Sequence, residues 1–484
     1  MFEIVNDHIR KKNARFLSYR GVSIPTYSEM KNPCEISASI QERLKEVELD
    51  SVNPLNLYRI TWKNEPAKKN GKFQSLPNFI EFPPELTGVK ARIVALSGKF
   101  FPTGAHKVGS SLACLIPRVI SGEFDLENTS AIWPSTGNFC RGGAFNSAIL
   151  GCNSISVLPE DMSKERFDWL NGISGEVIKT TGSESNVKEI YDRVHRLKKE
   201  RSNIIIFNQF CDFWNYLWHY EATSNAFLDL FESIKGETGR LTGICLSSGS
   251  SGTLGCADAI KAVYPAVKLA VGEALQCPTL LMNGYGEHRI EGVGDKHVPW
   301  IHNARNTDVV VGIDDNHCNE IFKLFNYPAG QNYLKSIGID NKIIKKLNWC
   351  GISGIANLCL AIKFSKYFEL SSEDIIFTIL TDSSEMYQSR LSENMLMPGN
   401  NFTLSDAQIT FLVSLQGIKT DYVEELSYRE KKRIHNLKYY TWIEQQGMPV
   451  EELNRQWDDP DYWENIQSKV ANIDVVIRDF NKNL

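Results

Sequence analysis

The sequence lacks long apolar runs and carries only a small excess of charge of one sign. No apolar stretch approaches the roughly 20 residues that a membrane-spanning helix requires, and the opening residues do not resemble a secretory signal. The formal net charge is −5 for 484 residues, which argues against nucleic acid or an anionic membrane as a main partner. We therefore expect a cytoplasmic protein that binds neither.

Motifs for metal binding and for disulfide pairing are also missing. The 11 cysteines form no C-x-x-C pair, and the 9 histidines show no H-E-x-x-H spacing. Scattered cysteines in odd number are typical of reduced, buried thiols rather than of a disulfide framework. The sequence predicts no metal site.

What the chain does contain is an alternation of short β-branched runs and helix-period segments. Hydrophobic residues make up 42% of the chain and charged residues 23%, which are ordinary shares for a globular protein. Buried strands are predicted at residues 92–96, 130–133, 154–158, 176–180, 204–207, 243–246, 268–271, 308–313 and 375–380. Apolar strands separated by helices, such as 189–200 and 254–263, favour parallel sheets that are covered on both faces. The predicted fold class is α/β, with two packed domains of parallel or mixed sheet and a helical C-terminal extension.

One lysine is notable for the segment around it. Lys107 lies in Phe-Pro-Thr-Gly-Ala-His-Lys-Val-Gly-Ser (101–110), after the strand-like run 91–96 and where a helix can begin. A lysine held there in a partly dry pocket can offer a free amine for imine chemistry. Taken alone, the segment is more typical of a solvated lysine at a helix start.

Two further segments join a predicted strand to a helix-like stretch through a small-residue turn. They are Pro-Ser-Thr-Gly-Asn at 134–138 and Ser-Ser-Gly-Ser-Ser-Gly-Thr at 247–253. Backbone N–H groups in such a turn can converge on an anion. Either turn could instead serve only the close packing of helix and strand. Neither is a P-loop or a G-x-G-x-x-G dinucleotide fingerprint.

The order of lysine turn, S-T-G-N loop and Gly/Ser-rich loop resembles the pyridoxal-phosphate enzymes of fold type II, the group of cysteine synthase, cystathionine β-synthase and the tryptophan synthase β-chain. The resemblance covers about residues 91–391. Further segments are similar to cysteine synthase motifs: L-P-E-D-M-S-K-E-R at 158–166, N-Q-F at 208–210, H-Y-E-A-T at 219–223, E-H-R-I-E-G-V-G at 287–294 and T-D-S-S-E-M-Y at 381–387.

The resemblance implies a role for each matching residue. Lys107 would bind the cofactor, pyridoxal 5′-phosphate, as an internal aldimine and then act as the base at the substrate Cα. Asn138 would contact the ring 3′-oxygen, and Ser383 the pyridine nitrogen. A hydroxyl at that nitrogen suits elimination of a β-substituent, although Ser383 is equally typical of a capping serine. The cofactor phosphate would bind to Gly249, Ser250, Ser251, Gly252 and Thr253. The substrate would bind to Ser135, Thr136, Gly137, Gln209 and Gly292.

Several residues depart from the cysteine synthase pattern and argue against simple O-acetylserine specificity. Phe139 replaces a threonine, and Arg141 stands where an apolar residue is usual. Asp295, Lys296 and His297 replace small residues after the 292–294 turn, and the lysine turn is closer to that of tryptophan synthase β-chains. Charged residues there suit a polar substrate, or else they are solvated surface charges.

These implications lead to a pyridoxal-phosphate-dependent lyase or transferase acting at Cβ of a small amino acid through an aminoacrylate. A thiol or sulfide nucleophile then adds, or water releases pyruvate and ammonia. Three alternatives stay open. The first is another fold-type II activity, threonine synthase-like or thiolase-type acyl transfer. The second is a non-catalytic regulatory paralogue that binds the cofactor, and the third is a subunit active only in a hetero-complex.

The expected organisation places the resemblance between two extensions. The N-terminal extension is 1–85, the large cofactor-binding domain is 86–127 and 211–397, the smaller mobile domain is 128–210, and the helical C-terminal extension is 398–484. In the last of these, a helix from Asp459-Pro460 is predicted to place Ile466, Val470, Ile473 and Ile477 on one stripe. We expect a homodimer.

Overall fold

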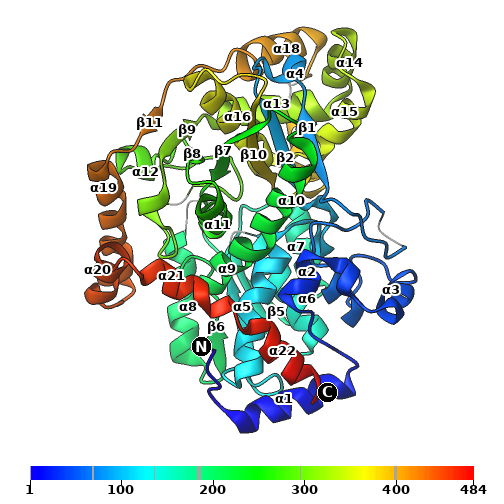
Figure 1. Ribbon diagram of the computed structural model, residues 1–484, viewed down its shortest axis with the longest axis vertical. Coiled ribbons are helices and arrows are strands. Elements are labelled where there is room, and N and C mark those ends of the chain that lie inside the picture. The colour runs from blue at the N-terminus through cyan, green and yellow to red at the C-terminus, as the bar shows by residue number, and fades with distance from the viewer. Residues whose placement is uncertain are drawn as a thin grey trace.

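The computed structural model describes residues 2–67, 70–135, 137–182, 187–294, 296–396 and 401–483, without the side chains of 393–396. Its larger sheet has the strand order β1-β2-β10-β7-β8-β9-β11 (Figure 1). The central strands run parallel, and the edge strands β1 and β11 are antiparallel to their neighbours. The bounds are β1 (Phe79–Phe82), β2 (Arg92–Ser97), β7 (Arg240–Ser247), β8 (Lys268–Ala274), β9 (Val309–Ile313), β10 (Asp374–Leu380) and β11 (Val423–Glu425).

The smaller sheet is parallel throughout, with the order β5-β4-β3-β6. Its strands are β3 (Ser130–Pro134), β4 (Ser154–Pro159), β5 (Glu176–Thr180) and β6 (Ile204–Ile206). The α/β fold expected from the sequence is confirmed, and each predicted strand is present. The short antiparallel edges β1 and β11 are not among the predicted strands.

Helices cover both sheets and form the two extensions. Their bounds are α1 (Asp7–Tyr19), α2 (Tyr27–Lys31), α3 (Ala38–Leu44), α4 (Pro84–Thr87), α5 (Lys107–Ser121), α6 (Asn138–Leu150), α7 (Lys164–Asn171), α8 (Val187–Glu200), α9 (Phe213–Trp218), α10 (Ser224–Ile234), α11 (Gly255–Val263), α12 (Thr279–Met282), α13 (Asp315–Asn326), α14 (Pro328–Ser336), α15 (Asn341–Lys346), α16 (Ile352–Tyr367), α17 (Gln388–Leu396), α18 (Leu404–Ile409), α19 (Tyr428–Lys438), α20 (Val450–Asp458), α21 (Tyr462–Gln467) and α22 (Ile473–Asn481). Within the described ranges no single helix is long and apolar enough to span a membrane, and one bent pair, 341–349 with 352–367, meets the length and composition test jointly.

Close contact between α5 and α6 brings the two predicted loops together. A Cβ on Gly142 of α6 would lie 2.7 Å from Val108 Cα and 3.0 Å from the Lys107 carbonyl oxygen. Only a glycine permits this approach, because such distances are shorter than real Cβ contacts. The first turns of the two helices therefore touch, and Lys107, the first residue of α5, lies next to the 135–138 loop.

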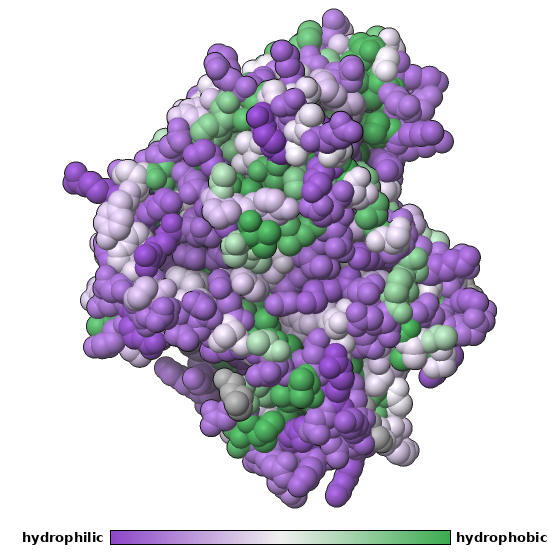
Figure 2. Space-filling view, viewed as in Figure 1, coloured by the Kyte–Doolittle hydropathy of each residue, from purple (hydrophilic) through white to green (hydrophobic). Residues whose placement is uncertain are grey.

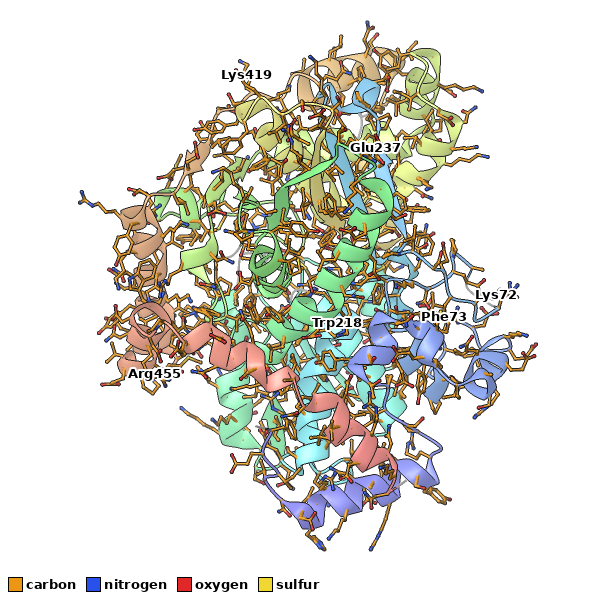
Figure 3. All side chains as sticks on the ribbon, in the orientation of Figure 1. Lys72, Phe73, Trp218, Glu237, Lys419 and Arg455 are labelled. Carbon is orange, nitrogen blue, oxygen red and sulfur yellow. The ribbon has the colours of Figure 1, made fainter. Side chains whose placement is uncertain are left out.

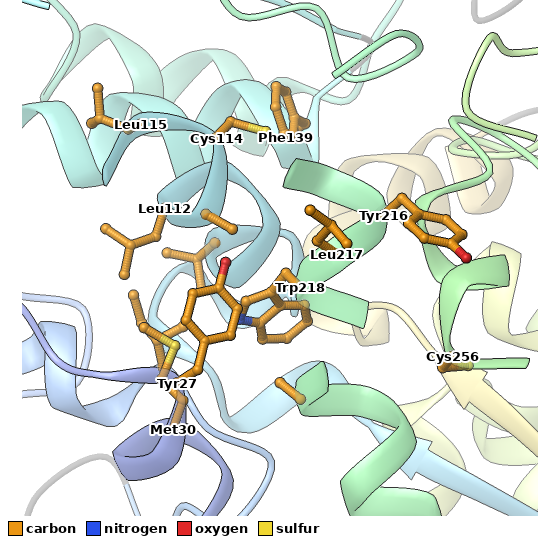
Figure 4. Packing of buried hydrophobic residues seen from close by; sticks show 14 of the residues in the cluster. Tyr27, Met30, Leu112, Cys114, Leu115, Phe139, Tyr216, Leu217, Trp218 and Cys256 are labelled. Atoms are coloured by element: carbon orange, nitrogen blue, oxygen red, sulfur yellow. The ribbon is translucent and has the colours of Figure 1, made fainter. Parts of the chain in front are cut away.

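A buried cluster that includes aromatic side chains packs against α5 (Figure 4). Trp218 of α9 is fully buried, and its ring lies parallel to that of His106 with the centroids 6.5 Å apart. Tyr27 and Met30 of α2 pack in the same cluster with Leu112. Figure 3 shows Trp218 inside the molecule, while Lys72 and Phe73 lie at its outer edge. The face in Figure 2 is mostly hydrophilic, with separate hydrophobic patches.

The two ends of the chain contact each other through α2 and α22 (Figure 1). The Asp474 carboxylate accepts hydrogen bonds from the backbone N–H groups of Tyr27 (2.6 Å) and Ser28 (3.0 Å), the first residues of α2. The predicted last helix is interrupted, because α21 and α22 are separated by a 3₁₀ turn at Ser468–Val470. Its apolar stripe is nevertheless buried as expected: Ile466, Val470, Ile473 and Ile477.

Candidate active site

Three of the predicted site residues are linked by hydrogen bonds, although they lie in segments that follow strands of two different sheets. The Lys107 Nζ donates to Gln209 Oε1 at 3.2 Å, and the Gln209 Nε2 donates to Ser135 Oγ at 3.2 Å. Ser135 follows β3 and Gln209 lies between β6 and α9. Because the carboxyl ends of parallel strands meet at one edge of a sheet, residues far apart in the chain converge here.

The predicted anion loop opens onto the same cavity as Lys107. Gly249, Ser250, Ser251 and Thr253 line this cavity together with Lys107. Ser251 has a φ of +62°, which turns the chain from β7 toward α11. The loop is tightly packed, since a Cβ on Gly249 would lie 2.5 Å from the carbonyl oxygen of Gly292, which also lines the cavity. The loop can thus present backbone N–H groups to an anion next to the lysine.

The cavity is also lined by two histidines, His106 and His219, which were not predicted as site residues. His106 is fully buried, and neither of its ring nitrogens has a hydrogen-bond partner. Burial lowers the pKa of His106 to about 3, with a further contribution from the charge of Lys107, so the ring is neutral at pH 7. His219 donates or accepts at Thr223 Oγ1, 2.9 Å from its Nδ1, and its ring lies 5.0 Å from that of His106. The T-G-A-H-K and H-Y-E-A-T segments are the sequence signals that could have located them.

The Asn138 side chain is paired with a carboxylate that the sequence analysis did not single out. Asn138 Nδ2 donates to Asp382 Oδ2 at 2.7 Å, while Asn138 Oδ1 is buried without a partner. Asp382 follows β10 and is fully buried, and burial raises the pKa of its carboxyl against the opposing effects of Arg166 and Asn138. Ser383 is also buried, but the residue of this turn that lines the cavity is Thr381.

A buried charged network joins the smaller sheet to the 287–294 turn. Arg166 of α7 forms an ion pair with Glu291, and its Nη2 donates to the Tyr387 hydroxyl at 3.1 Å. The Asp382 carboxylate lies 3.8 Å from the same guanidinium. Arg390 also donates to Glu291, at 3.1 Å. A Cβ on Gly137 would lie 2.6 Å from Arg166 Cδ, so the glycine of the S-T-G-N loop gives this arginine its space.

Lys296 and His297, which the sequence suggested for contact with a polar substrate, do not line the cavity that contains Lys107. His297 is buried among Tyr191, Phe210 and Trp442, and it is absent from the cavity lining. Lys296 lies over the ring of Tyr285, at 5.3 Å. Two other predicted residues, Thr136 and Asp295, lie outside the described residues.

The lining fits pyridoxal 5′-phosphate. A lysine amine for the aldehyde and a backbone-rich loop for the phosphate meet at one cavity. The unpaired ring nitrogens of His106 and the unpaired hydroxyl of Ser247 are buried polar groups in that lining, and a polar ligand would satisfy them.

Comparison with known proteins agrees with this fit. Residues 86–326 match the family model described as pyridoxal-phosphate dependent enzyme. A cystathionine β-synthase of Saccharomyces cerevisiae is 23% identical over 367 residues, which are 73% of this chain and 68% of the yeast protein. A cysteine synthase of Staphylococcus aureus is 27% identical over 289 residues, 60% of this chain and 84% of the relative.

Solved structures show the same fold. A hydrogen sulfide-producing enzyme of Fusobacterium nucleatum superposes with a TM-score of 0.55 at 22% sequence identity, covering 64% of this chain and 96% of that structure. The matched region contains Lys107, the 135–138 loop and the 249–253 loop in the family order. This chain therefore belongs to the fold-type II superfamily of pyridoxal-phosphate-dependent enzymes.

Proposed function

We propose that this chain catalyses β-elimination or β-replacement on a small amino acid, with a thiol or sulfide as the incoming nucleophile in the replacement. The observation that carries the proposal is the chain Lys107–Gln209–Ser135, which begins in the cavity lined by the 249–253 loop. The relatives named as cysteine synthase and cystathionine β-synthase support the same reaction class.

Pyridoxal 5′-phosphate, when bound, supplies an electron sink that stabilises negative charge at the substrate Cα. Lys107 would hold its aldehyde carbon, and Gly249, Ser250, Ser251, Gly252 and Thr253 would hold its phosphate. Asn138 would reach the 3′-oxygen from the start of α6. The sequence resemblance assigns Ser383 to contact the pyridine nitrogen. Thr381, which lines the cavity, could make that contact instead.

The remaining residues bind substrate and move a proton. Ser135, Gly137 and Gln209 would bind the α-carboxylate, together with Thr136, and the hydrogen bond from Lys107 to Gln209 links that carboxylate to the base. Lys107 would remove the Cα proton, and the leaving group would then depart from Cβ. The His106 ring beside Lys107 is buried and neutral at pH 7.

Movement of the smaller domain, 128–210, would open the site to substrate. Its Arg166 meets Glu291 of the large domain in a buried ion pair, so this contact would form on closure and exclude water from the cavity. We also expect a homodimer, which light scattering of the purified protein tests.

The decisive assay gives the purified holoenzyme L-serine, O-acetyl-L-serine, L-cysteine and L-threonine, with and without sulfide. Release of pyruvate, or formation of a new amino acid with sulfide, supports the proposal. O-phospho-L-homoserine or an acyl thioester, supplied in parallel assays, as the sole productive substrate would assign the chain to a threonine synthase-like or acyl-transferring activity instead. Ser383→Ala and Thr381→Ala are compared for cofactor affinity, and the larger loss identifies the residue at the pyridine nitrogen.

A further inference from the structure

Arg141 is a buried arginine that forms no ion pair with any residue in the described part of the chain. It belongs to the first turn of α6, and the residue is 5% exposed. Its Nη1 donates to the thioether of Met386 at 2.8 Å, and its guanidinium lies 4.7 Å from the centre of the Trp169 ring. The Nε is buried and has no hydrogen-bond partner. A thioether is a weak acceptor, so these contacts leave most of the guanidinium donors unused.

No carboxylate oxygen of the described residues lies within 4.0 Å of this guanidinium. Asp50 and Asp382 act on it only through longer-range attraction, and Arg166 repels it. Burial, with that repulsion, lowers the pKa of Arg141 to about 10, so the side chain is still charged at pH 7. Arg166, by contrast, is equally buried but is paired with Glu291. Since a buried charge is costly unless it is paired, Arg141 is a group that an anion would stabilise.

The position of Arg141 ties it to the active site. It follows Asn138 by three residues on the same helical face, and both side chains meet the turn after β10, Asn138 at Asp382 and Arg141 at Met386. The next residue, Gly142, is the glycine whose Cα faces the carbonyl of Lys107. Arg141 is thus one turn from the residue assigned to the cofactor ring, on the helix that packs against α5. Like Asn138 and Gln209, it stands outside the lining of the Lys107 cavity itself.

We propose that Arg141 binds an anionic oxygen group, phosphate or carboxylate, carried by the β-substituent of the substrate. This inference rests on the proposed β-elimination or β-replacement and names the substrate class for it. In the proposed function Ser135, Gly137 and Gln209 are assigned to the α-carboxylate, so Arg141 would serve a second anion. A guanidinium presents a planar fork of donors that suits either group, and the Trp169 ring holds that plane.

The test compares three substrates with the wild-type holoenzyme: O-phospho-L-serine, O-succinyl-L-serine and the neutral O-acetyl-L-serine. We expect kcat/KM to be at least about tenfold higher for one of the anionic substrates, and whichever it is identifies phosphate or carboxylate as the recognised group. This comparison needs no variant. If these three substrates and also L-serine and L-cysteine are inert, the proposed function fails. If only L-serine or L-cysteine is turned over, the proposed function stands and the role of Arg141 is refuted. If O-acetyl-L-serine is turned over at least as efficiently as both anionic substrates, the proposed function stands and the role of Arg141 is refuted.

Variants then locate the effect. Arg141→Met should lower kcat/KM for the preferred anionic substrate by about one to two powers of ten and leave that for O-acetyl-L-serine within about threefold. Arg141→Lys should restore part of the loss through KM. Arg193→Met, which removes a half-exposed arginine of α8, is the matched control and should change neither value. An equal loss for neutral and anionic substrates, in a variant that still holds cofactor, would show that Arg141 binds the α-carboxylate or serves packing alone.

Discussion

Glu291→Gln should destabilise the folded protein strongly. The Arg166 side chain is 1% exposed and that of Glu291 8%, so water screens their attraction little. Glu291 also accepts from Arg390 at 3.1 Å. Removing one partner of a buried ion pair typically costs about 3–5 kcal/mol, because the other charge stays buried without compensation. The glutamine retains one acceptor oxygen, which places the expected loss near the lower end, about 3 kcal/mol.

The measurement is urea unfolding of the holoenzyme, followed by tryptophan fluorescence, for wild type and two variants. Glu81→Gln is the control, because Glu81 pairs with Arg92 at 2.7 Å with the two side chains 36% and 28% exposed. A pair this accessible is worth about 0–1 kcal/mol. Because Arg166 and Glu291 belong to opposite sides of the site, Glu291→Gln should also raise KM. A loss for Glu291→Gln no larger than that for Glu81→Gln would refute the inference that this network holds the halves together.

Three further predictions concern particular side chains. His297→Gln should keep kcat/KM near wild type and flatten the acid dependence of stability. Burial lowers the folded-state pKa of His297 to about 3, so the stability that it contributes is complete above its ordinary pKa of 6.5 and is lost as the pH falls. Between pH 7.5 and 5, the free energy of unfolding of wild type should therefore fall by about 2 kcal/mol more than that of the variant. Urea titration at both pH values measures this difference. Gly142→Ala should lower the melting temperature and kcat together, because its Cβ would press on Val108 and Lys107. Gly172→Ala is the control and should change neither, because its Cβ would meet no atom closer than 3.5 Å. Equal behaviour of the two variants would argue against the close α5–α6 contact. Lys438→Met should increase proteolysis of the C-terminal extension, since Lys438 donates to the Trp300 and His302 carbonyls at 2.9 and 2.7 Å and the variant leaves both without that donor; unchanged cleavage would show that other contacts hold the extension.

Sequence reasoning located the parts of the site that depend on local chain geometry. Lys107 and the loops 135–138 and 249–253 each follow a parallel strand, and parallel strands bring their carboxyl ends to one edge, so their convergence follows from the strand order along the chain. The roles assigned to the individual residues stay predictions. The nine predicted strands could be found because β-branched runs this apolar have to be buried on both faces.

What the sequence could not provide are contacts between residues far apart in the chain. Arg166 and Glu291 are 125 residues apart, and neither has a local pattern that selects the other as its partner. His297 looked like a charged lid residue because its burial depends on Trp442, which the C-terminal extension supplies. The break between α21 and α22 has no proline or glycine to announce it, and tertiary packing overrides the helical period there.

The most direct test of the central claim is to identify the lysine that carries the cofactor. The holoenzyme is reduced with borohydride and digested, and the peptides are analysed by mass spectrometry for a pyridoxyl-phosphate adduct. The account predicts the adduct on Lys107, next to His106 in the cavity that the 249–253 loop lines, and its loss together with the yellow colour in Lys107→Ala. An adduct on a different lysine, or a Lys107→Ala protein that keeps both colour and adduct, would contradict it.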